Sequence, residues 1–229
     1  MKRIIAFLLA ATLLLLAGCS RTGENTEEGF VDTETGIEYV YCTPMGLYPV
    51  NPETDEDEKP VEYLSVENRD GSKTVFYKVE YENPESFLCY KENGFYFLAY
   101  NKSISEPTVA EFSPIAASIY NSANTGYITS FWADNKYLPD ELKEHNSSED
   151  TWLCELIAEN LTNGEHVEVP ASEKEITDLF YIRLLSQKYP GLFYLVSFFG
   201  YNGRYFLRNG TTGKTVYCPR EVILRMVGE

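Results

Sequence analysis

The sequence predicts an α+β fold, with antiparallel β-sheet and at least two helices. Three pairs of short apolar runs, rich in Tyr and Phe, flank turns that contain Asn-Gly or Asp-Gly, a pattern typical of β-hairpins. Two other segments carry the start and stop signals of helices. A chain that combines hairpins with a few separate helices is expected to pack those helices on an antiparallel sheet.

The three hairpins are recognised by their turns. Their paired runs are 61–66 with 74–80, 87–92 with 95–100, and 192–201 with 204–208. The turns between these runs contain Asp70-Gly71, Asn93-Gly94 and Asn202-Gly203. Such dipeptides favour the positive φ angles of a type I′ turn, whose twist matches that of paired strands. Each pair of runs is therefore predicted to form two antiparallel strands.

Two helices are predicted in the second half of the chain. The longer covers 172–188, because Ser172-Glu173-Lys174-Glu175 makes a capping box and Tyr189-Pro190-Gly191 provides an end. Its apolar residues recur at helical spacing: Ile176, Leu179, Phe180 and Leu184. The shorter covers 219–227, because proline suits the first helical position and a glycine follows the last.

An internal repeat is one interpretation of the segments before these helices. Residues 162–170 align with 211–219 at a constant offset of 49, with four of nine positions identical, and a predicted helix follows each final proline. A looser third copy covers 108–114. A unit of strand, turn, strand and helix would bury its apolar face against the next copy. Two unrelated hairpins would give the same match, because such turns are common.

The first 20 residues have the layout of a bacterial export signal. Lys2 and Arg3 precede an apolar run of 14 residues, 4–17, and a membrane-spanning helix needs about 20. The run closes with Leu16-Ala17-Gly18-Cys19, which resembles the lipobox of bacterial lipoprotein precursors. This resemblance covers residues 1–20 only, and no family is recognised for residues 37–229.

The resemblance implies that residues 1–18 are a signal peptide and that Cys19 is the lipidation site. Fatty acyl chains such as palmitate would then anchor the protein to the cell membrane on its extracytoplasmic side. Residues 19–36 contain only two bulky apolar residues, Phe30 and Val31, so we expect a lipidated flexible tether. One globular domain is expected over 37–229, with two sub-regions at about 37–105 and 106–229. Between 41 and 60, prolines and the acidic run 53–58 favour an exposed loop.

The charge of the chain excludes one class of partner. Without residues 1–18, 17 Lys and Arg stand against 35 Asp and Glu, a formal charge of −18. Binding to nucleic acid requires basic side chains that displace counterions from phosphate. We therefore expect no nucleic-acid partner, and we expect contact with the membrane through the lipid anchor.

The cysteines allow two interpretations. Four of them follow Cys19, and none belongs to a closely spaced pair: Cys42, Cys89, Cys154 and Cys218. An exported chain can form disulfides, but cysteines are equally common as reduced, buried apolar residues. Structural zinc needs closely spaced ligands, which neither these cysteines nor the two histidines provide.

No residue is predicted to be catalytic or to bind a cofactor or metal. Nucleophilic hydrolysis needs a serine or cysteine beside a base, and His145 and His166 both fall in segments expected to be exposed. The acidic run 53–58 lacks the glycine and the spacing of a calcium loop. No glycine-rich phosphate loop is present between a strand and a helix.

The hairpin 192–208 carries the candidate binding site. Its two-residue turn would pair Tyr201 with Arg204, so that opposed residues share a face. One face is expected to be core: Val196, Phe198, Tyr205 and Leu207. The other combines aromatic rings with guanidinium groups, a mixture enriched at interfaces: Ser197, Phe199, Tyr201, Arg204, Phe206 and Arg208. Alternatively, a helix over 173–188 covers this second face, and the arginines pair with carboxylates.

The sequence thus favours a membrane-tethered extracytoplasmic lipoprotein that binds a protein or glycan of the envelope. The alternative is an envelope hydrolase that acts through carboxylates or a cysteine. That alternative requires a cleft that contains titratable groups with shifted pKa values.

Overall fold

The described residues form two β-sheets and three helices. The computed structural model describes residues 21–41, 47–50, 60–123, 126–132, 147–148, 152–169 and 175–228. The fold is mainly β rather than a balanced α+β fold. The expectation of antiparallel sheet with at least two helices is confirmed, and no described helix has the length and hydropathy needed to cross a membrane.

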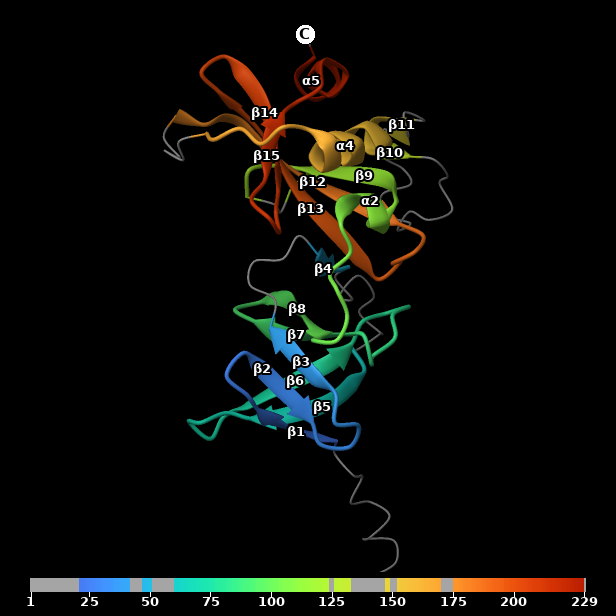
Figure 1. Cartoon of the computed structure of the whole chain (residues 1–229), viewed down its shortest axis with the longest axis vertical. Coiled ribbons are helices and arrows are strands. Elements are labelled where there is room, and N and C mark those ends of the chain that lie inside the picture. The colour runs from blue at the N-terminus through green and yellow to red at the C-terminus, as the bar shows by residue number, and fades with distance from the viewer. Residues whose placement is uncertain are drawn as a thin grey trace, which may run out of the picture.

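The first sheet is a closed barrel of seven strands (Figure 1). In order around the barrel the strands are β1 (Thr22–Asn25), β2 (Gly29–Asp32), β3 (Glu38–Tyr41), β8 (Phe95–Asn101), β7 (Phe87–Glu92), β6 (Lys73–Lys78) and β5 (Glu62–Glu67). Neighbouring strands are antiparallel, except that β1 and β5 run parallel where the barrel closes. Closure leaves the barrel without a free edge along which another chain could pair.

Aromatic rings fill the barrel interior. The ring centroid of Phe30 lies 4.1 Å from that of Phe76 and 5.0 Å from that of Tyr39, and all three residues are fully buried. Gly23 of β1 makes room for them, since a Cβ there would lie 2.9 Å from a methyl carbon of Val66. The N-terminal strands are therefore part of the core.

The flexible tether expected up to residue 36 is thus wrong for residues 21–36, which the structure describes. β1 and β2 are only four residues long, and their inward residues include Gly23 and Asp32, so their sequence lacks a strand-like apolar pattern. β1 and β2 are instead held in place by packing against the interior aromatic rings and by strand pairing of β1 with β5 and of β2 with β3.

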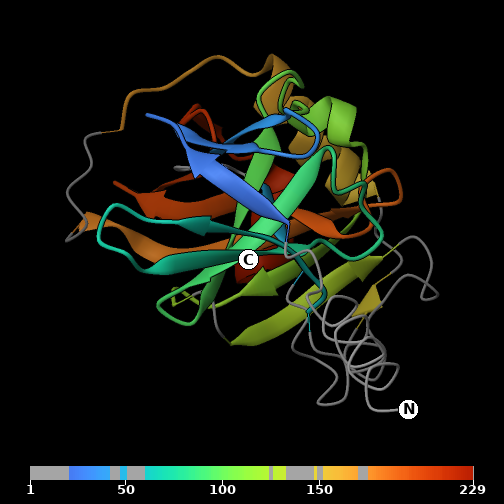
Figure 2. The ribbon, with the colours of Figure 1, turned by 90° about the horizontal axis from the view of Figure 1, so that it is seen from below.

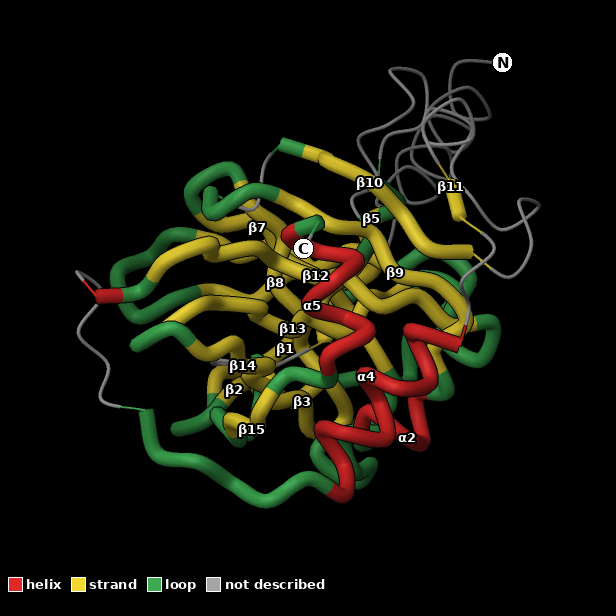
Figure 3. Tube along the Cα trace, turned by 90° about the horizontal axis from the view of Figure 1, so that it is seen from above, coloured by secondary structure: helices red, strands yellow, loops and turns green. Residues whose placement is uncertain are grey.

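The second sheet is assembled mainly from the rest of the chain. Its strands, in spatial order, are β11 (Ser147–Ser148), β10 (Tyr127–Trp132), β9 (Pro114–Tyr120), β12 (Thr177–Ser186), β13 (Leu192–Tyr201), β14 (Arg204–Asn209) and β15 (Thr215–Tyr217). A strand from the segment expected to be loop, β4 (Leu47–Pro49), pairs with β13. The helices are α2 (Val109–Phe112), α4 (Trp152–Asn163) and α5 (Arg220–Val227), which gather on one side of the strands (Figure 3).

A shared core joins the two sheets. Buried residues of the second sheet, such as Ile182 and Val196, belong to the same apolar cluster as Ile157 of α4 and Leu98 on the outside of the barrel. Seen from below, the barrel strands lie in front of the second sheet (Figure 2). The backbones also meet, because a Cβ at Gly191 would lie 1.9 Å from the carbonyl oxygen of Glu80.

The predicted helix over 172–188 is wrong. Its described part, from 175 onward, contains the ten-residue strand β12 between β9 and β13. Phe180 and Leu184 lie four positions apart, a spacing that suits one face of a helix and equally one face of a strand. The alternation of buried Ile182, Leu184 and Ser186 shows that strand periodicity is realised. Two flanking strands supply the ladder hydrogen bonds that decide between the two structures.

The hairpins and the C-terminal helix are confirmed. β5–β6, β7–β8 and β13–β14 are antiparallel pairs, and φ is positive at both residues of Asn93-Gly94 and Asn202-Gly203. α5 begins after Pro219 and ends at Gly228, whose φ of 73° is left-handed.

The proposed internal repeat is not a structural repeat. Residues 211–219 contain β15 and lead into α5, but 162–163 end α4, 164–169 form no regular element, and strand β12 follows. The signal peptide, Cys19, Cys42, the acidic run 53–58 and His145 lie outside the described residues.

Candidate functional site

The β13–β14 hairpin has the predicted register. Tyr201 is opposite Arg204, Phe199 is opposite Phe206, and Ser197 is opposite Arg208. The predicted core face is confirmed, since Val196, Phe198 and Leu207 are fully buried. Its remaining member, Tyr205, is partly buried against them. The candidate residues therefore share the opposite face of the sheet.

Phe199 and Phe206 form the floor of this face. They are 1% and 3% exposed, and their rings stack with centroids 5.6 Å apart. Tyr217 of β15 lies beside Phe206, with ring centroids 5.3 Å apart, and the guanidinium carbon of Arg208 is 4.9 Å from the centroid of Phe199. The helix that was expected to cover this face is absent from the described residues, because residues 177–186 form strand β12 beside β13 in the same sheet. Phe199 is therefore excluded as a direct contact, and Phe206 offers only a small exposed area, but both rings support the side chains that are exposed.

The two arginines are held by neutral groups. Nη1 of Arg204 donates to the hydroxyl oxygen of Tyr217 at 2.9 Å, and its guanidinium carbon lies 5.6 Å from that ring centroid. Nε of Arg208 donates to Oγ1 of Thr215 at 3.0 Å. Within the described part of the chain, no carboxylate lies within 4.0 Å of either guanidinium. Each group therefore keeps other N–H donors for a ligand.

A groove lies between this face and the segment 165–169. Val167 N–H donates to the carbonyl of Thr215 at 2.8 Å, and Thr215 N–H donates to Nδ1 of His166 at 3.2 Å. The segment has no described backbone hydrogen bond to Tyr217, two positions further along β15. The segment therefore leaves the sheet edge there, and the space between them opens.

The groove has two recesses, which together we call the hairpin groove. The first, of about 320 Å³, is lined by Val167, Glu168, Val169, Tyr201, Asn202, Arg204, Phe206 and Tyr217. The second, of about 590 Å³, is lined by His166, Val167, Glu168, Val169, Arg208, Gly213 and Thr215. Both volumes fall in the range of small-ligand sites. Two arginines against one glutamate give this groove a positive formal charge on a chain whose net charge is −16.

The sequence did not reveal the second wall of the groove. That wall is segment 165–169, which is brought to the hairpin only by the fold, as is Tyr217, which is 47% exposed beside Phe206. In the sequence, the alignment of 162–170 with 211–219 was the feature that related this segment to the region around Tyr217. Those two segments do lie side by side, joined through Val167 and Thr215, although they do not repeat each other.

The same face carries a second arrangement of arginine over rings. The guanidinium carbon of Arg183 lies 3.8 Å from the ring centroid of Tyr120 and 4.7 Å from that of Phe193. Burial lowers the pKa of Arg183, and interaction with Tyr120 partly opposes that shift. Stacked guanidinium groups are therefore a general feature of this face.

The described cysteines are reduced and lie in the core. Cys89, Cys154 and Cys218 are free and buried, which confirms the second interpretation for these three. Burial raises the pKa of the Cys89 and Cys154 thiols to about 12, and it raises that of Cys218 as well. Because the thiolate is the nucleophile, none of the three is suited to nucleophilic catalysis near neutral pH.

Outside the groove, Glu82 is a partly buried carboxyl group with a structural partner. Burial raises the pKa of Glu82, which accepts the N–H of Gly191 at the junction of the sheets. His166 is exposed and lines the second recess of the groove. In the described ranges, no group of three or more His, Cys, Asp or Glu is placed to hold a metal ion.

Comparison with known proteins assigns no family to this arrangement. No protein-family model matches the sequence, and neither curated proteins nor solved structures give a significant match.

Proposed function

We propose that the protein is an extracytoplasmic lipoprotein, anchored to the cell membrane through Cys19, that binds an envelope protein or glycan in the hairpin groove. The anchoring is supported by Leu16-Ala17-Gly18-Cys19, which directly follows an apolar run too short to span a bilayer. Binding is supported by the geometry of Arg204 and Arg208.

The availability of these guanidinium groups carries the proposal. A hydrogen bond to a hydroxyl and a neighbouring ring fix each side chain, but neither contact neutralises its charge. An arginine fixed in this way loses little conformational freedom when it binds, and its planar fork suits carboxylate oxygens. Tyr201 and Tyr217 add aromatic area on the same wall, which is the composition of interface hot spots.

A photo-crosslinking amino acid at position 217 tests the proposal in cells that carry the lipidated protein. Leu224 on α5 is the matched control, because it is 41% exposed and does not line the groove. We expect one dominant adduct from position 217, none from position 224, and a weaker adduct after Arg204→Gln. Protease or glycosidase sensitivity of the adduct identifies the partner as protein or glycan. Equal adducts from both positions, or a yield that Arg204→Gln does not change, would overturn groove binding.

A further inference from the structure

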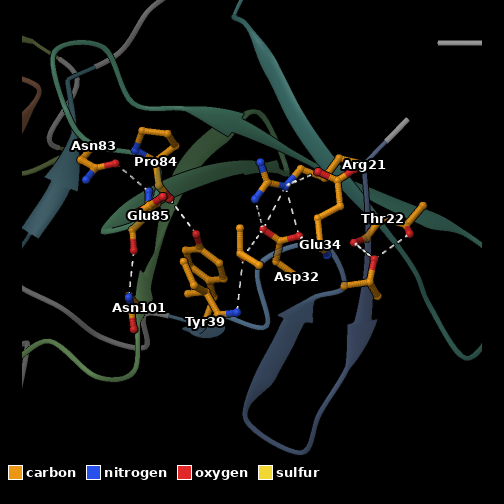
Figure 4. Close-up of polar contacts among 12 residues, drawn as sticks. Arg21, Thr22, Asp32, Glu34, Tyr39, Asn83, Pro84, Glu85 and Asn101 are labelled. Carbon is orange, nitrogen blue, oxygen red and sulfur yellow. Dashed lines mark hydrogen bonds and ion pairs between the residues drawn. The ribbon is translucent and has the colours of Figure 1, made fainter. Parts of the chain in front are cut away.

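The first described residue, Arg21, is fixed to the barrel through both its backbone and its guanidinium group. Its guanidinium group binds both carboxylate oxygens of Asp32, as Figure 4 shows. Its carbonyl oxygen accepts the N–H of Ser65 at 3.0 Å, and its guanidinium carbon lies 4.1 Å from the ring centroid of Tyr63. These contacts fix Arg21 at the start of β1.

The partner carboxylate lies inside the barrel. Asp32 is fully buried, and it also accepts Glu34 N–H at 3.0 Å and the Thr35 hydroxyl at 2.7 Å. Burial alone would raise the pKa of Asp32, but the hydrogen bonds from Arg21, Thr35 and the backbone lower it below its usual value. Separation of this pair would leave a buried charge without compensation, so Arg21 is held firmly.

Only one residue separates Arg21 from the proposed lipid attachment site. Consecutive Cα atoms are about 3.8 Å apart, so the Cα of Cys19 lies within about 8 Å of the Cα of Arg21 in any conformation. A flexible tether of 16 residues would have allowed roughly 20 to 24 Å. Lipid on Cys19 therefore fixes the start of β1 close to the headgroups.

The residues around the start of β1 form what we call the anchor edge: Arg21, Thr22, Thr33, Glu34, Val61 and Glu62. Thr33 N–H donates to the carbonyl of Thr22, and the parallel register places Ser65 opposite Thr22, so that the start of β5 extends past the start of β1. Within this edge, the charge of Arg21 is neutralised by Asp32, Glu34 lies within 3.6 Å of the same guanidinium group, and both Glu34 and Glu62 are exposed. The edge has no excess of positive charge that would bind anionic lipid, so its approach to the membrane depends on the covalent anchor.

β1 belongs to the barrel wall that faces away from the second sheet. Its neighbours are β2 and β5, whereas the outer side of β7 and β8 packs on the second sheet through Cys89 and Leu98. β1 accordingly lies near one end of the molecule, and α5 and the C terminus lie at the other (Figure 1). The barrel stands between the anchor edge and the sheet that carries the hairpin groove.

We infer that the lipid on Cys19 holds the anchor edge against the lipid headgroups, and that the barrel is a rigid spacer that directs the hairpin groove away from the bilayer. The inference rests on the lipidation of Cys19 proposed above. The partner of the anchor edge is the membrane surface, and the groove faces the envelope space beyond it.

Energy transfer to the membrane tests this orientation. The lipidated full chain is placed in phosphatidylcholine vesicles that carry an acceptor dye on the headgroups, with a donor dye on Thr33→Cys or on Leu224→Cys. Cys42 is replaced by Ser in every variant, and the buried thiols of Cys89, Cys154 and Cys218 resist labelling. We expect transfer several-fold stronger from position 33 than from position 224. Insertion of 16 Gly and Ser residues between Ser20 and Arg21 should reduce the difference.

Two results overturn the inference and are distinguishable. Equal transfer from both positions in a chain whose mass includes the lipid would show that the anchored domain tumbles, and this would leave the proposed anchoring intact. A chain whose mass lacks lipid, and which behaves like the Cys19→Ala variant in vesicle flotation, would overturn the anchoring proposal together with the orientation.

Discussion

The barrel and the second sheet use arginine in opposite ways. In the barrel, partly exposed Arg21 binds the fully buried carboxylate of Asp32, so the two charges neutralise each other. On the second sheet, Arg204 and Arg208 rest on hydroxyl groups and rings, and their charges are not neutralised by described carboxylates. An arginine paired with a buried carboxylate is thus structural, whereas an arginine held only by hydroxyl groups and rings keeps its charge available for a ligand.

The largest effect is expected when the barrel is opened. A chain that begins at Ile37 lacks β1 and β2, including the fully buried ring of Phe30, and leaves β3 and β5 with unpaired edges. We expect the barrel to lose its cooperative thermal unfolding, measured by circular dichroism. A chain that begins at Arg21 is the control and should melt cooperatively. Equal melting of the two chains would show that β1 and β2 contribute nothing to the barrel.

The next largest effect is expected at the ion pair itself. Arg21→Ala leaves the buried Asp32 carboxylate without its cation and should lower the free energy of unfolding by about 3 kcal/mol, measured in urea. Lys102→Gln is the matched control, because it removes only exposed ion pairs to Glu28 and Glu38 and should lower the free energy of unfolding much less than Arg21→Ala. Comparable losses in both variants would contradict a structural role specific to Arg21.

The pH dependence of stability should separate the two regions further. Because the pKa of Asp32 is lowered in the folded chain, its stabilising contribution is present above the ordinary aspartate value of 3.8 and is lost as the pH falls through the folded value. Asp32→Asn should therefore lose less stability than the parent on acidification below pH 3.8. Arg204→Gln should follow the parent curve. Parallel curves for Asp32→Asn and the parent would refute the linkage.

The smallest effect on stability is expected in the groove. Arg204→Gln and Arg208→Gln each remove a hydrogen bond to a neutral hydroxyl at a partly or fully exposed position, so each should cost about 1 kcal/mol or less. Thermal melting of each variant checks this. A loss as large as that of Arg21→Ala would mean that these arginines are structural too.

Sequence patterns predicted the elements whose determinants are local. The Asn202-Gly203 turn set the register of β13 and β14, and Pro219 and Gly228 bracketed α5. β1 and β2 were missed because a glycine and a charged aspartate occupy inward positions of short strands, where the barrel supplies the context. β12 was assigned as a helix because residues spaced by four fit both periods.

The candidate site was predictable only along one strand pair. Alternation within the hairpin placed Tyr201, Arg204 and Arg208 on one face, as found. The position of Tyr217 beside Phe206, and the opposite wall formed by segment 165–169, depend on long-range packing, which no local pattern encodes. The burial of Phe199 and Phe206 likewise follows from neighbours on other strands.

The most direct test of the account is the crosslinking yield from position 217 in the double variant Arg204→Gln/Arg208→Gln, in lipidated protein whose melting temperature is measured in parallel. The account predicts that the adduct is lost while the melting temperature stays within a few degrees of the parent. An undiminished adduct in a folded double variant would contradict the claim that these arginines are held ready for a partner.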